Sequence, residues 1–251
     1  MEEILSEING AVRTVTLNRP EKRNALDPEM LVDLESIFRS QPLEAERVVI
    51  LRAEGPVFCA GLDLANPDGL GSGEGSIETM LNAIEQYPLP VVGIVQGDAI
   101  AGGNELALHC DIVIASEEAR FGMSLAQLGL APSWFLAKKL VELAGPVITR
   151  ELLLLGEPIR AARMHRLGII ARAVPADKLQ ETADKYVNRL AANAPLSLVA
   201  MKALLNRLMA FREGIEHGVV DRLVQNATSS NDAKEGVAAR LEKRRPNFTG
   251  S

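Results

Sequence analysis

The stretch "VVGIVQGDAIAGGNELALHCDIVIASEEARFG", residues 91–122, decides the fold. It begins as an apolar strand that ends near Val95. Gly102 and Gly103 stand where "NELALHC" predicts the start of a helix, and "DIVIASEEARFGM" predicts two further short extended segments. Glu105 lies alone among alanines and leucines. Burying an unpaired charge is costly, so this glutamate needs an explanation.

A helix start with two glycines has a defined local chemistry. The first backbone N–H groups of a helix lack an internal partner and lie at the positive end of its dipole. Glycines at Gly102 and Gly103 let a ligand approach that backbone closely, which favours a site for an anion or a developing oxyanion. The alternative is that the glycines only allow two chain segments to cross and that Glu105 caps the helix. The residues alone leave both interpretations open.

The flanking sequence predicts strands that alternate with helices. Residues 11–20 and 47–55 are typical of strands, and residues 77–88 of a helix. Asp27 is a candidate N-cap for a further helix, with Pro28 at its first position. Residues 66–78, rich in Gly and Ser, predict a mobile loop. From Trp134 onward the apolar spacing is mainly helical, with breaks at Pro146, Pro158, Pro175 and Pro195. The pattern predicts an α/β chain with a helical C-terminal region.

Composition excludes several classes of protein. The chain has 251 residues, 47% hydrophobic and 24% charged, which excludes a disordered chain. A net charge of -6 without a basic face argues against nucleic-acid binding. The N-terminal "MEEILSEING" lacks the basic and apolar regions of a signal peptide, and no apolar run approaches the roughly 20 residues that span a bilayer. With only two cysteines, we expect a cytoplasmic protein that binds neither nucleic acid nor membrane.

A second motif, "GPVFCAGLDL" at residues 55–64, also runs from a strand into a glycine turn. Together with residues 91–122 it resembles the enoyl-CoA hydratase/isomerase family, the crotonases. Residues 15–30 resemble the family's N-terminal strand, CoA-contacting loop and first helix. Residues 153–175 resemble its "G...A.eA...GLV..VvP" segment, and residues 231–248 resemble its C-terminal "D..EG..AF.eKR.P.F". Five matches in the right order make the resemblance specific.

The resemblance implies a fold, a substrate and an assembly. The fold is a crotonase-like spiral of repeated strand-strand-helix turns over residues 1–190, which carries the CoA-thioester site. Residues 191–251 form a C-terminal helical trimerisation region, so we expect a homotrimer or a hexamer built as a dimer of trimers. The substrate is an acyl-CoA thioester, with no additional cofactor.

The resemblance also implies roles for individual residues. The backbone N–H groups of Leu62 and Gly102 hold the thioester oxygen as negative charge develops on it. Glu105 matches the first of the two glutamates with which hydratases of this family activate and deliver water. Lys243 and Arg244 in the tail, and Arg23, help to offset the negative charge of the CoA. The expected substrate-binding residues are Arg23, Ala25, Ala60, Gly61, Asp63, Leu64, Gly103, Leu125, Trp134, Phe135, Lys243 and Phe248.

The chain departs from the family at the second glutamate. The family segment "FG.pE..lG..P..G" matches "FGMSLAQLGLAPSWFL", residues 121–136, and places Leu125 at the glutamate position. Trp134 and Phe135 replace part of the glycine-rich turn, which indicates either a reshaped acyl pocket or plain packing. A hydratase needs one group to take a proton from water and another to deliver one to carbon. Three functions remain open: an enoyl-CoA hydratase-type lyase or isomerase with Glu105 as the single acid/base, a decarboxylase or other enolate chemistry, and a catalytically weak acyl-CoA-binding protein.

Other polar residues near the motifs have simpler explanations. Asp63 and Asp98 are typical turn residues. His109 follows Glu105 by one helical turn and either hydrogen-bonds it or belongs to the core or a subunit contact. No pair among His109, His165 and His217 has a metal-binding spacing, so we predict no metal. Cys59 and Cys110 adjoin the motifs, and packing accounts for both, so neither is assigned as a nucleophile.

Overall fold

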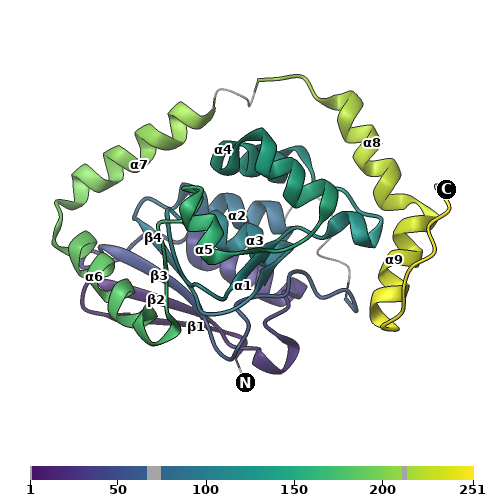
Figure 1. Cartoon of the computed structure of the whole chain (residues 1–251). Helices are drawn as coiled ribbons and strands as arrows, with labels where there is room; N and C mark the ends of the chain where they lie inside the picture. Colours follow the sequence, from purple (N-terminus) through teal and green to yellow (C-terminus); the bar gives the residue numbers. More distant parts are fainter. Residues whose placement is uncertain (1, 67–74, 211–213) are drawn as a thin grey trace.

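The computed structural model describes residues 2–66, 75–210 and 214–251, and it confirms the α/β prediction (Figure 1). The strands are β1 (Ile4–Asn9), β2 (Val12–Leu17), β3 (Val48–Ala53), β4 (Val91–Val95), β5 (Ala99–Ile100), β6 (Ile112–Ser116), β7 (Arg120–Gly122), β8 (Ile159–Arg160) and β9 (Arg172–Val174). The α-helices are α1 (Pro28–Arg39), α2 (Ile77–Gln86), α3 (Gly102–Leu108), α4 (Trp134–Arg150), α5 (Ala161–Arg166), α6 (Leu179–Ala192), α7 (Pro195–Met209), α8 (Gly218–Ser229) and α9 (Asn231–Leu241). Short 3-10 or π turns are η1 (Pro20–Lys22), η3 (Leu125–Leu128), η4 (Glu151–Leu155) and η5 (Ala176–Lys178).

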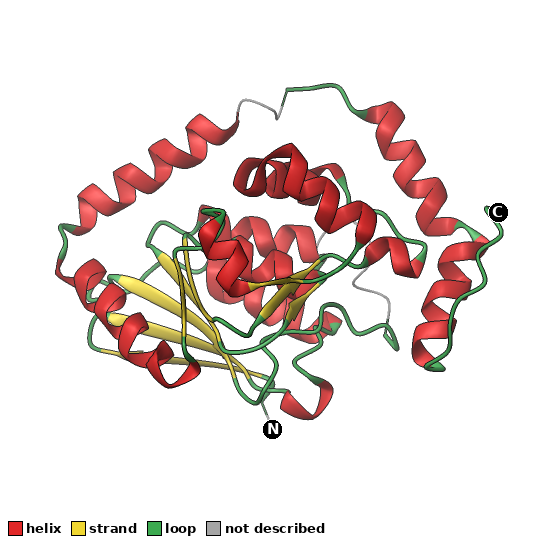
Figure 2. Cartoon of the chain, viewed as in Figure 1, coloured by secondary structure: helices red, strands yellow, loops and turns green. Residues whose placement is uncertain are grey.

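The larger sheet has six strands in the order β1-β2-β3-β4-β6-β9 (Figure 2). β1 and β2 form an antiparallel hairpin, and every later pair is parallel. Along β3, Val48 and Ile50 pack with α6, whereas Val49 and Leu51 belong to the main core on the other face. A strand buried on both faces needs a continuous apolar run, which explains "VVIL" in β3.

The smaller sheet pairs β5 with β7 in parallel and β7 with β8 in the antiparallel sense. A bridge between Cys59 and Ala99 extends it toward the 55–64 motif. The turns of the chain that begin with β4 and β6 each add one strand to the larger sheet and one to the smaller sheet, and a helix then leads to the next turn. This is the arrangement of the predicted strand-strand-helix spiral. The pairing brings residues 59–62 next to the start of α3.

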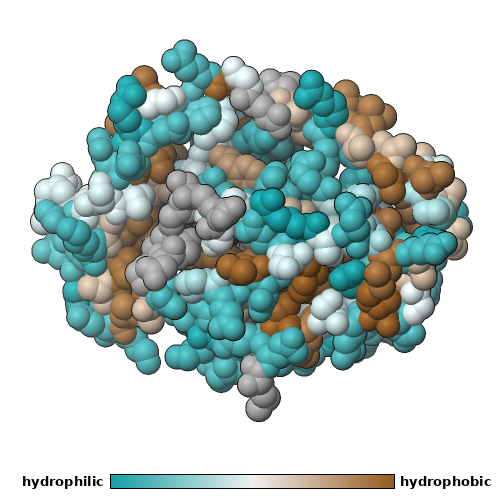
Figure 3. All heavy atoms as spheres, turned by 180° about the vertical axis from the view of Figure 1, so that it is seen from behind, coloured by the Kyte–Doolittle hydropathy of each residue, from teal (hydrophilic) through white to brown (hydrophobic). Residues whose placement is uncertain are grey.

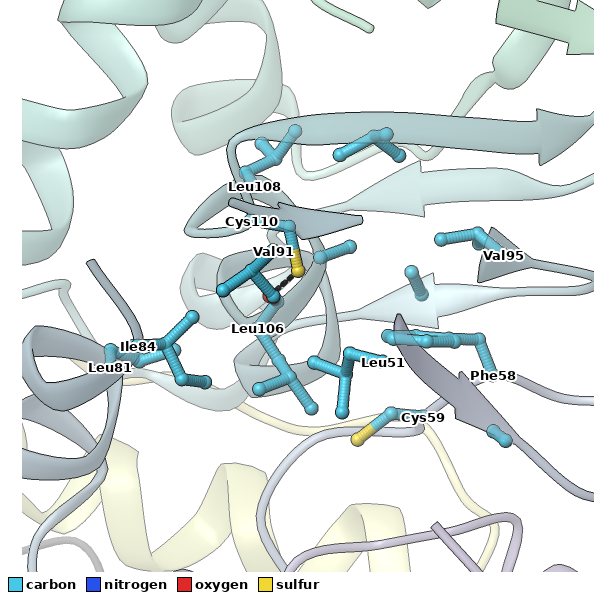
Figure 4. Close-up of a cluster of buried hydrophobic side chains, with 14 of the residues drawn as sticks. Leu51, Phe58, Cys59, Leu81, Ile84, Val91, Val95, Leu106, Leu108 and Cys110 are labelled. Carbon is cyan, nitrogen blue, oxygen red and sulfur yellow. Dashed lines mark hydrogen bonds between the residues drawn. The ribbon is translucent and has the colours of Figure 1, made fainter. Parts of the chain in front are cut away.

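The main core lies between the larger sheet and helices α1, α2 and α3. Figure 4 shows Leu51 of the sheet and Leu81, Ile84 and Leu106 of the helices close together, with Phe58 from the segment that follows β3. The Cys110 thiol donates to the Leu106 carbonyl at 3.5 Å, within the same apolar surroundings. The two cysteines are thus packing residues of the core, as predicted.

Helix boundaries follow the predicted signals. The Asp27 carboxylate accepts from the Met30 N–H at 2.9 Å, and Pro28 opens α1. Gly145, at φ 65°, breaks α4 before Pro146, and Pro195 opens α7. The region after Trp134 also holds the short strands β8 and β9, where a mainly helical pattern was predicted. Of the predicted loop 66–78, residues 67–74 lie outside the described residues, and α2 already begins at Ile77.

Helices α7 and α8 lie outside the layered core (Figure 1). The Lys202 ammonium of α7 donates to the Asp111 carboxylate at 2.6 Å and to the Leu89 carbonyl at 3.1 Å, which ties this helix to the core. No residue of α8 is buried. α6 ends at Ala192 and α7 begins at Pro195, close to the predicted division at residue 190. Among the described residues no helix is long and apolar enough to cross a bilayer.

Two glycines mark places where backbone segments touch. A Cβ on Gly97 would lie 2.0 Å from the Pro56 carbonyl oxygen, and one on Gly103 would lie 2.1 Å from the Cys59 carbonyl oxygen. Neither neighbour is a flexible side chain, so neither contact relaxes by rotation about a side-chain bond. At Gly103 the structure therefore shows the close crossing of two chain segments that was one interpretation of the glycine pair.

Substituting Gly103→Ala should destabilise the protein by about 1–3 kcal/mol or more, because the added methyl collides with backbone. Urea unfolding followed by circular dichroism measures the loss. Gly218→Ala is the control, since a Cβ there meets no atom within 4 Å and its φ is ordinary. Equal unfolding midpoints for the two variants would contradict the contact.

Candidate functional site

The candidate site lies where the 55–64 motif meets the start of α3. The Ile100 N–H donates to the Cys59 carbonyl at 2.9 Å, and the Leu26 N–H donates to the Gly61 carbonyl at 2.8 Å. Gly61 has φ 95°, a conformation that a side chain would strain, and a Cβ there would lie 2.9 Å from the Ile100 carbonyl oxygen. This turn carries the chain past the helix start at Gly102.

Two backbone N–H groups stand together at this crossing. A Cβ on Gly102 would lie 3.5 Å from the Leu62 nitrogen and 2.7 Å from Ile77 Cδ1. Within the described parts of the chain, neither the Leu62 N–H nor the Gly102 N–H donates to a protein acceptor. Ala101, at φ 50° and ψ -117°, makes the bend that starts α3. The arrangement offers two donors to one oxygen, with no side chain at Gly102 to block it.

Leu62 and Gly102 both line a cavity of about 540 Å³. Leu62, Ile100 and Gly102 form part of its wall, and the start of α2 and the loop around η3 form other parts. Further parts come from α4, α8, α9 and the C-terminal tail. Its lining is mainly apolar and includes Ala60, Leu62, Leu64, Ile77, Glu78, Ile100, Ala101, Gly102, Met123, Ser124, Leu125, Gln127, Leu128, Leu130, Ala131, Pro132, Ser133, Leu136, Val224, Thr228, Gly236, Arg240, Arg244, Pro246 and Phe248. A cavity of this size and character is typical of a small-molecule site.

The structure brings some of the predicted substrate-binding residues to this wall and places others elsewhere. Those on the wall are Ala60, Leu64, Leu125 and Phe248. Gly61 and Gly103 support the crossing behind it. Arg23, exposed at φ 55°, lies beside this region because its carbonyl accepts from the Ala60 N–H at 3.1 Å.

Ala25 and Asp63 both bind the guanidinium of Arg19. It donates to the Ala25 carbonyl at 3.0 Å and to the Asp63 carboxylate at 3.1 Å. Asp63 also accepts from the Ala65 N–H two residues on, at 3.1 Å, the turn-fixing geometry suggested by its sequence position. Asp98 is held in a bidentate pair by Arg120.

Glu105 is fully enclosed and lies outside the wall of the cavity. Among the described residues, none lies at hydrogen-bonding distance and angle to either of its carboxyl oxygens. Burial raises its pKa to about 8, against the opposing effect of the Lys139 charge. A carboxyl group with this pKa is mostly protonated at neutral pH and is able to donate a proton.

His109 packs beside Glu105 as a neutral side chain. Its Nδ1–H donates to the Glu105 backbone carbonyl at 2.8 Å, while the Glu105 carboxylate is 3.8 Å from Nδ1. Burial and the Lys139 charge lower its pKa to about 4. The ring stacks on Phe135 with centroids 5.3 Å apart. His109 is thus a core residue that fills space against the helix of Glu105.

Trp134 and Phe135 lie away from the large cavity. Both line a separate hollow of about 220 Å³ between α2, α4 and α7. Trp134 stacks on His217 at 4.7 Å between centroids, and Phe135 stacks on His109. The plain packing interpretation fits both rings better than a reshaped acyl pocket, because their neighbours are rings and helix faces. Leu125, in contrast, does lie on the cavity wall.

The C-terminal tail of the same chain forms part of the cavity wall. Arg244 lies on the wall, and the carboxylates of Glu235 and Glu242 pair with its guanidinium. Lys243 is exposed beside it at φ 57° and is absent from the wall. Arg240 also lines the cavity, and no acid pairs with it in the described part of the chain.

Most of the neutral residues on the wall and two charged ones, Arg240 and Glu78, were missed at the sequence level. Arg240 had a readable signal, because it stands where the family's tail pattern has Phe. Glu78 had none, since acidic residues are common in the first turn of a helix.

Burial raises the pKa of the Cys59 and Cys110 thiols to about 12, which makes both poor nucleophiles. Across residues 2–66, 75–210 and 214–251 no group of three His, Cys, Asp or Glu side chains is placed to hold a metal.

The Glu105 pKa predicts a pH-dependent stability. It lies near 8 in the folded protein against 4.5 for an ordinary glutamate, so the unfolded chain releases a proton that the folded protein keeps. The contribution of Glu105 to stability should therefore fall, by at most about 1.4 kcal/mol per pH unit, as the pH rises from about 4.5 to 8. Urea midpoints at pH 5, 6, 7 and 8 should show Glu105→Gln gaining on wild type across that range. Parallel curves would contradict the raised pKa.

A family model and several known proteins match nearly the whole chain. The family model for enoyl-CoA hydratase/isomerase matches residues 7–251. A putative enoyl-CoA hydratase of Thermus thermophilus is 37% identical, with 95% of this chain and 98% of that protein covered. The 1,2-epoxyphenylacetyl-CoA isomerase of Escherichia coli is 34% identical, covering 100% of this chain and 99% of its own.

A solved structure supports the same assignment. Methylmalonyl-CoA decarboxylase complexed with 2S-carboxypropyl-CoA superimposes with a TM-score of 0.92 at 26% identity, covering 100% of this chain and 99% of the other. The match runs through both sheets and the C-terminal helices, and the family model covers the two segments that form the amide pair. The chain therefore belongs to the enoyl-CoA hydratase/isomerase family.

Proposed function

We propose that the protein hydrates enoyl-CoA thioesters, or dehydrates the corresponding hydroxyacyl-CoA, with Glu105 as an acid/base. The observation that carries this proposal is the pair of unpartnered N–H groups, Leu62 and Gly102, on the wall of a large apolar cavity next to a buried glutamic acid. The names of the hydratase relatives support the same reaction.

The amide pair would act on the thioester oxygen. As water adds to the β-carbon, negative charge moves to that oxygen, and the Leu62 and Gly102 N–H groups stabilise it. One such donor is typically worth about 3–4 kcal/mol, because it is already oriented when the charge develops. The apolar wall excludes water and so strengthens both hydrogen bonds.

Glu105 would deliver the proton to the α-carbon. With a pKa of about 8 it carries that proton at neutral pH. Its carboxyl group lies three residues beyond Gly102 along α3 and is enclosed, so the transfer requires its side chain to turn toward the cavity. Its oxygens break no hydrogen bond to the described residues when they move, which lowers the cost of that turn.

The CoA portion of the substrate would lie along the tail and the Arg23 loop. Arg240, Lys243 and Arg23 offer charges to its phosphates, whereas the guanidinium of Arg244 is already neutralised by Glu235 and Glu242. The acyl-CoA is the substrate, and the proposed reaction uses no additional cofactor or metal.

A decarboxylase is the second candidate. Leu125 replaces the second glutamate of the hydratases with an apolar side chain on the cavity wall. Loss of carbon dioxide from a malonyl-type thioester forms the same enolate and needs only one proton donor. The similarity to methylmalonyl-CoA decarboxylase over the whole chain favours this alternative.

A panel of acyl-CoA thioesters analysed by mass spectrometry distinguishes the candidates. We expect an enoyl-CoA to gain water, and Glu105→Gln to lower turnover by about 100-fold or more with CoA affinity retained, the usual scale of acid–base catalysis. Loss of carbon dioxide from a malonyl-type thioester would instead identify the decarboxylase. No change in any thioester would leave a protein that only binds acyl-CoA.

We also propose that the chain assembles as a trimer or as a hexamer of two trimers. Apolar side chains gather at the end of the molecule where α7 lies, seen from behind in Figure 3. On α7 the more than half-exposed apolar residues are Leu196, Met201, Leu204, Leu205 and Leu208. Val219 and Leu223 continue this apolar character on α8. Apolar helix faces of this extent favour burial against other subunits.

Light scattering after gel filtration should give the mass of three or six chains at micromolar concentration. Leu204→Lys should dissociate the assembly, because it places a charge in the apolar face of α7. Leu43→Lys is the control, since Leu43 is 55% exposed in a loop between α1 and β3. A monomeric wild-type protein would refute the assembly.

A further inference from the structure

We propose that Glu78 is a second catalytic carboxylate, which activates the water that adds to the substrate. The inference rests on the proposed hydration and supplies the group that Leu125 cannot provide. Of the described residues that line the large cavity, Glu78 is the single carboxylic acid.

Helix α2 places this carboxylate next to the amide pair. Ile77, the first residue of α2, puts its Cδ1 against Gly102, only 2.7 Å from where a Cβ would stand. Glu78 follows directly and shares the cavity wall with Leu62 and Leu64. Glu78 and the two residues of the amide pair therefore line the same cavity, and the start of α2 lies against Gly102.

The surroundings of Glu78 suit a base that must hold water. Its side chain is half-buried and makes no hydrogen bond or ion pair with the residues that the structure describes. A helix-capping role is already filled, because the Ser76 hydroxyl accepts from the Thr79 N–H at 3.3 Å. Both carboxylate oxygens of Glu78 are thus available to a water molecule.

The two acids divide the reaction between them. Glu78 takes a proton from water while the water oxygen bonds to the β-carbon, and the π electron pair of the double bond moves to give the enolate. The Leu62 and Gly102 N–H groups hold the resulting oxyanion. The enolate then re-forms the thioester carbonyl as its α-carbon takes the proton of Glu105. Glu78 ends protonated and Glu105 ionised, and exchange with solvent restores both.

This division separates two measurable half-reactions. Exchange of the α-hydrogens of butanoyl-CoA in D₂O needs the amide pair and Glu105 but adds no water. Hydration of but-2-enoyl-CoA needs Glu78 as well. A merely structural role for Glu78 would change both rates together.

The test compares Glu78→Gln with Glu29→Gln in the full-length protein. Glu29 is the matched control, because it occupies the same position in the first turn of α1 behind a capped N-terminus, and it is exposed away from the cavity. We expect Glu78→Gln to lower kcat for hydration about 100-fold or more. Its α-hydrogen exchange should stay within about twofold of wild type, and Glu29→Gln should leave both rates unchanged.

Three outcomes would overturn the inference. Normal hydration by Glu78→Gln would remove Glu78 from the mechanism and leave the proposed function standing. Equal losses of hydration and exchange would assign Glu78 a structural role. A wild-type protein that exchanges α-hydrogens but hydrates no enoyl-CoA would overturn the proposed function together with this role.

Discussion

The site depends on one crossing of two backbone segments. Gly103 passes so close to the Cys59 carbonyl that a Cβ would lie 2.1 Å from the oxygen. Because this contact joins backbone to backbone, no choice of side-chain rotamer relieves it. The same crossing brings the Leu62 nitrogen beside Gly102, where the helix start leaves its own N–H without an acceptor. The same crossing therefore fixes both the packing and the position of the amide pair. Gly103 allows the close backbone contact, and Gly102 leaves the space beside the Leu62 nitrogen free of a side chain.

The sequence predicts well those elements whose signals are local. The Asp27 cap with Pro28, the doubly buried strand β3 and the breaks at Pro146 and Pro195 all follow from the preferences of a few neighbouring residues. The short strands β8 and β9 do not, because two or three residues carry no period. They are strands only because β7 and β6 lie alongside them, which is a property of the folded chain.

The candidate site shows the same difference between features with a local sequence signal and features that depend on the folded chain. The motifs locate Glu105, Leu62 and Gly102, since the spacing of the glycines and the glutamate is local. The apolar residues around Glu105 indicate that it is buried, but they give no indication that its carboxyl oxygens lack a hydrogen-bond partner among the described residues, because that depends on the folded surroundings. The tail also folds back on itself, so Arg244 meets Glu235, nine residues earlier, and its charge is neutralised before any ligand arrives. A count of basic residues in the sequence therefore overestimates the positive charge at the cavity.

Lys139 of α4 shifts the pKa of Glu105, the proposed catalytic acid, without lining the cavity. Lys139 pairs with Glu85 at 3.0 Å, and its charge lowers the pKa values of both Glu105 and His109. Burial alone would keep Glu105 protonated to a still higher pH and make its proton harder to release, so the ammonium offsets part of that cost. The Lys139 charge also helps to keep His109 neutral. A protonated His109 would be a second cation beside Glu105 and would lower the pKa of Glu105 further. Lys139 does not line the cavity, yet it brings the pKa of Glu105 closer to neutral. A carboxyl group with such a pKa can both release and regain a proton.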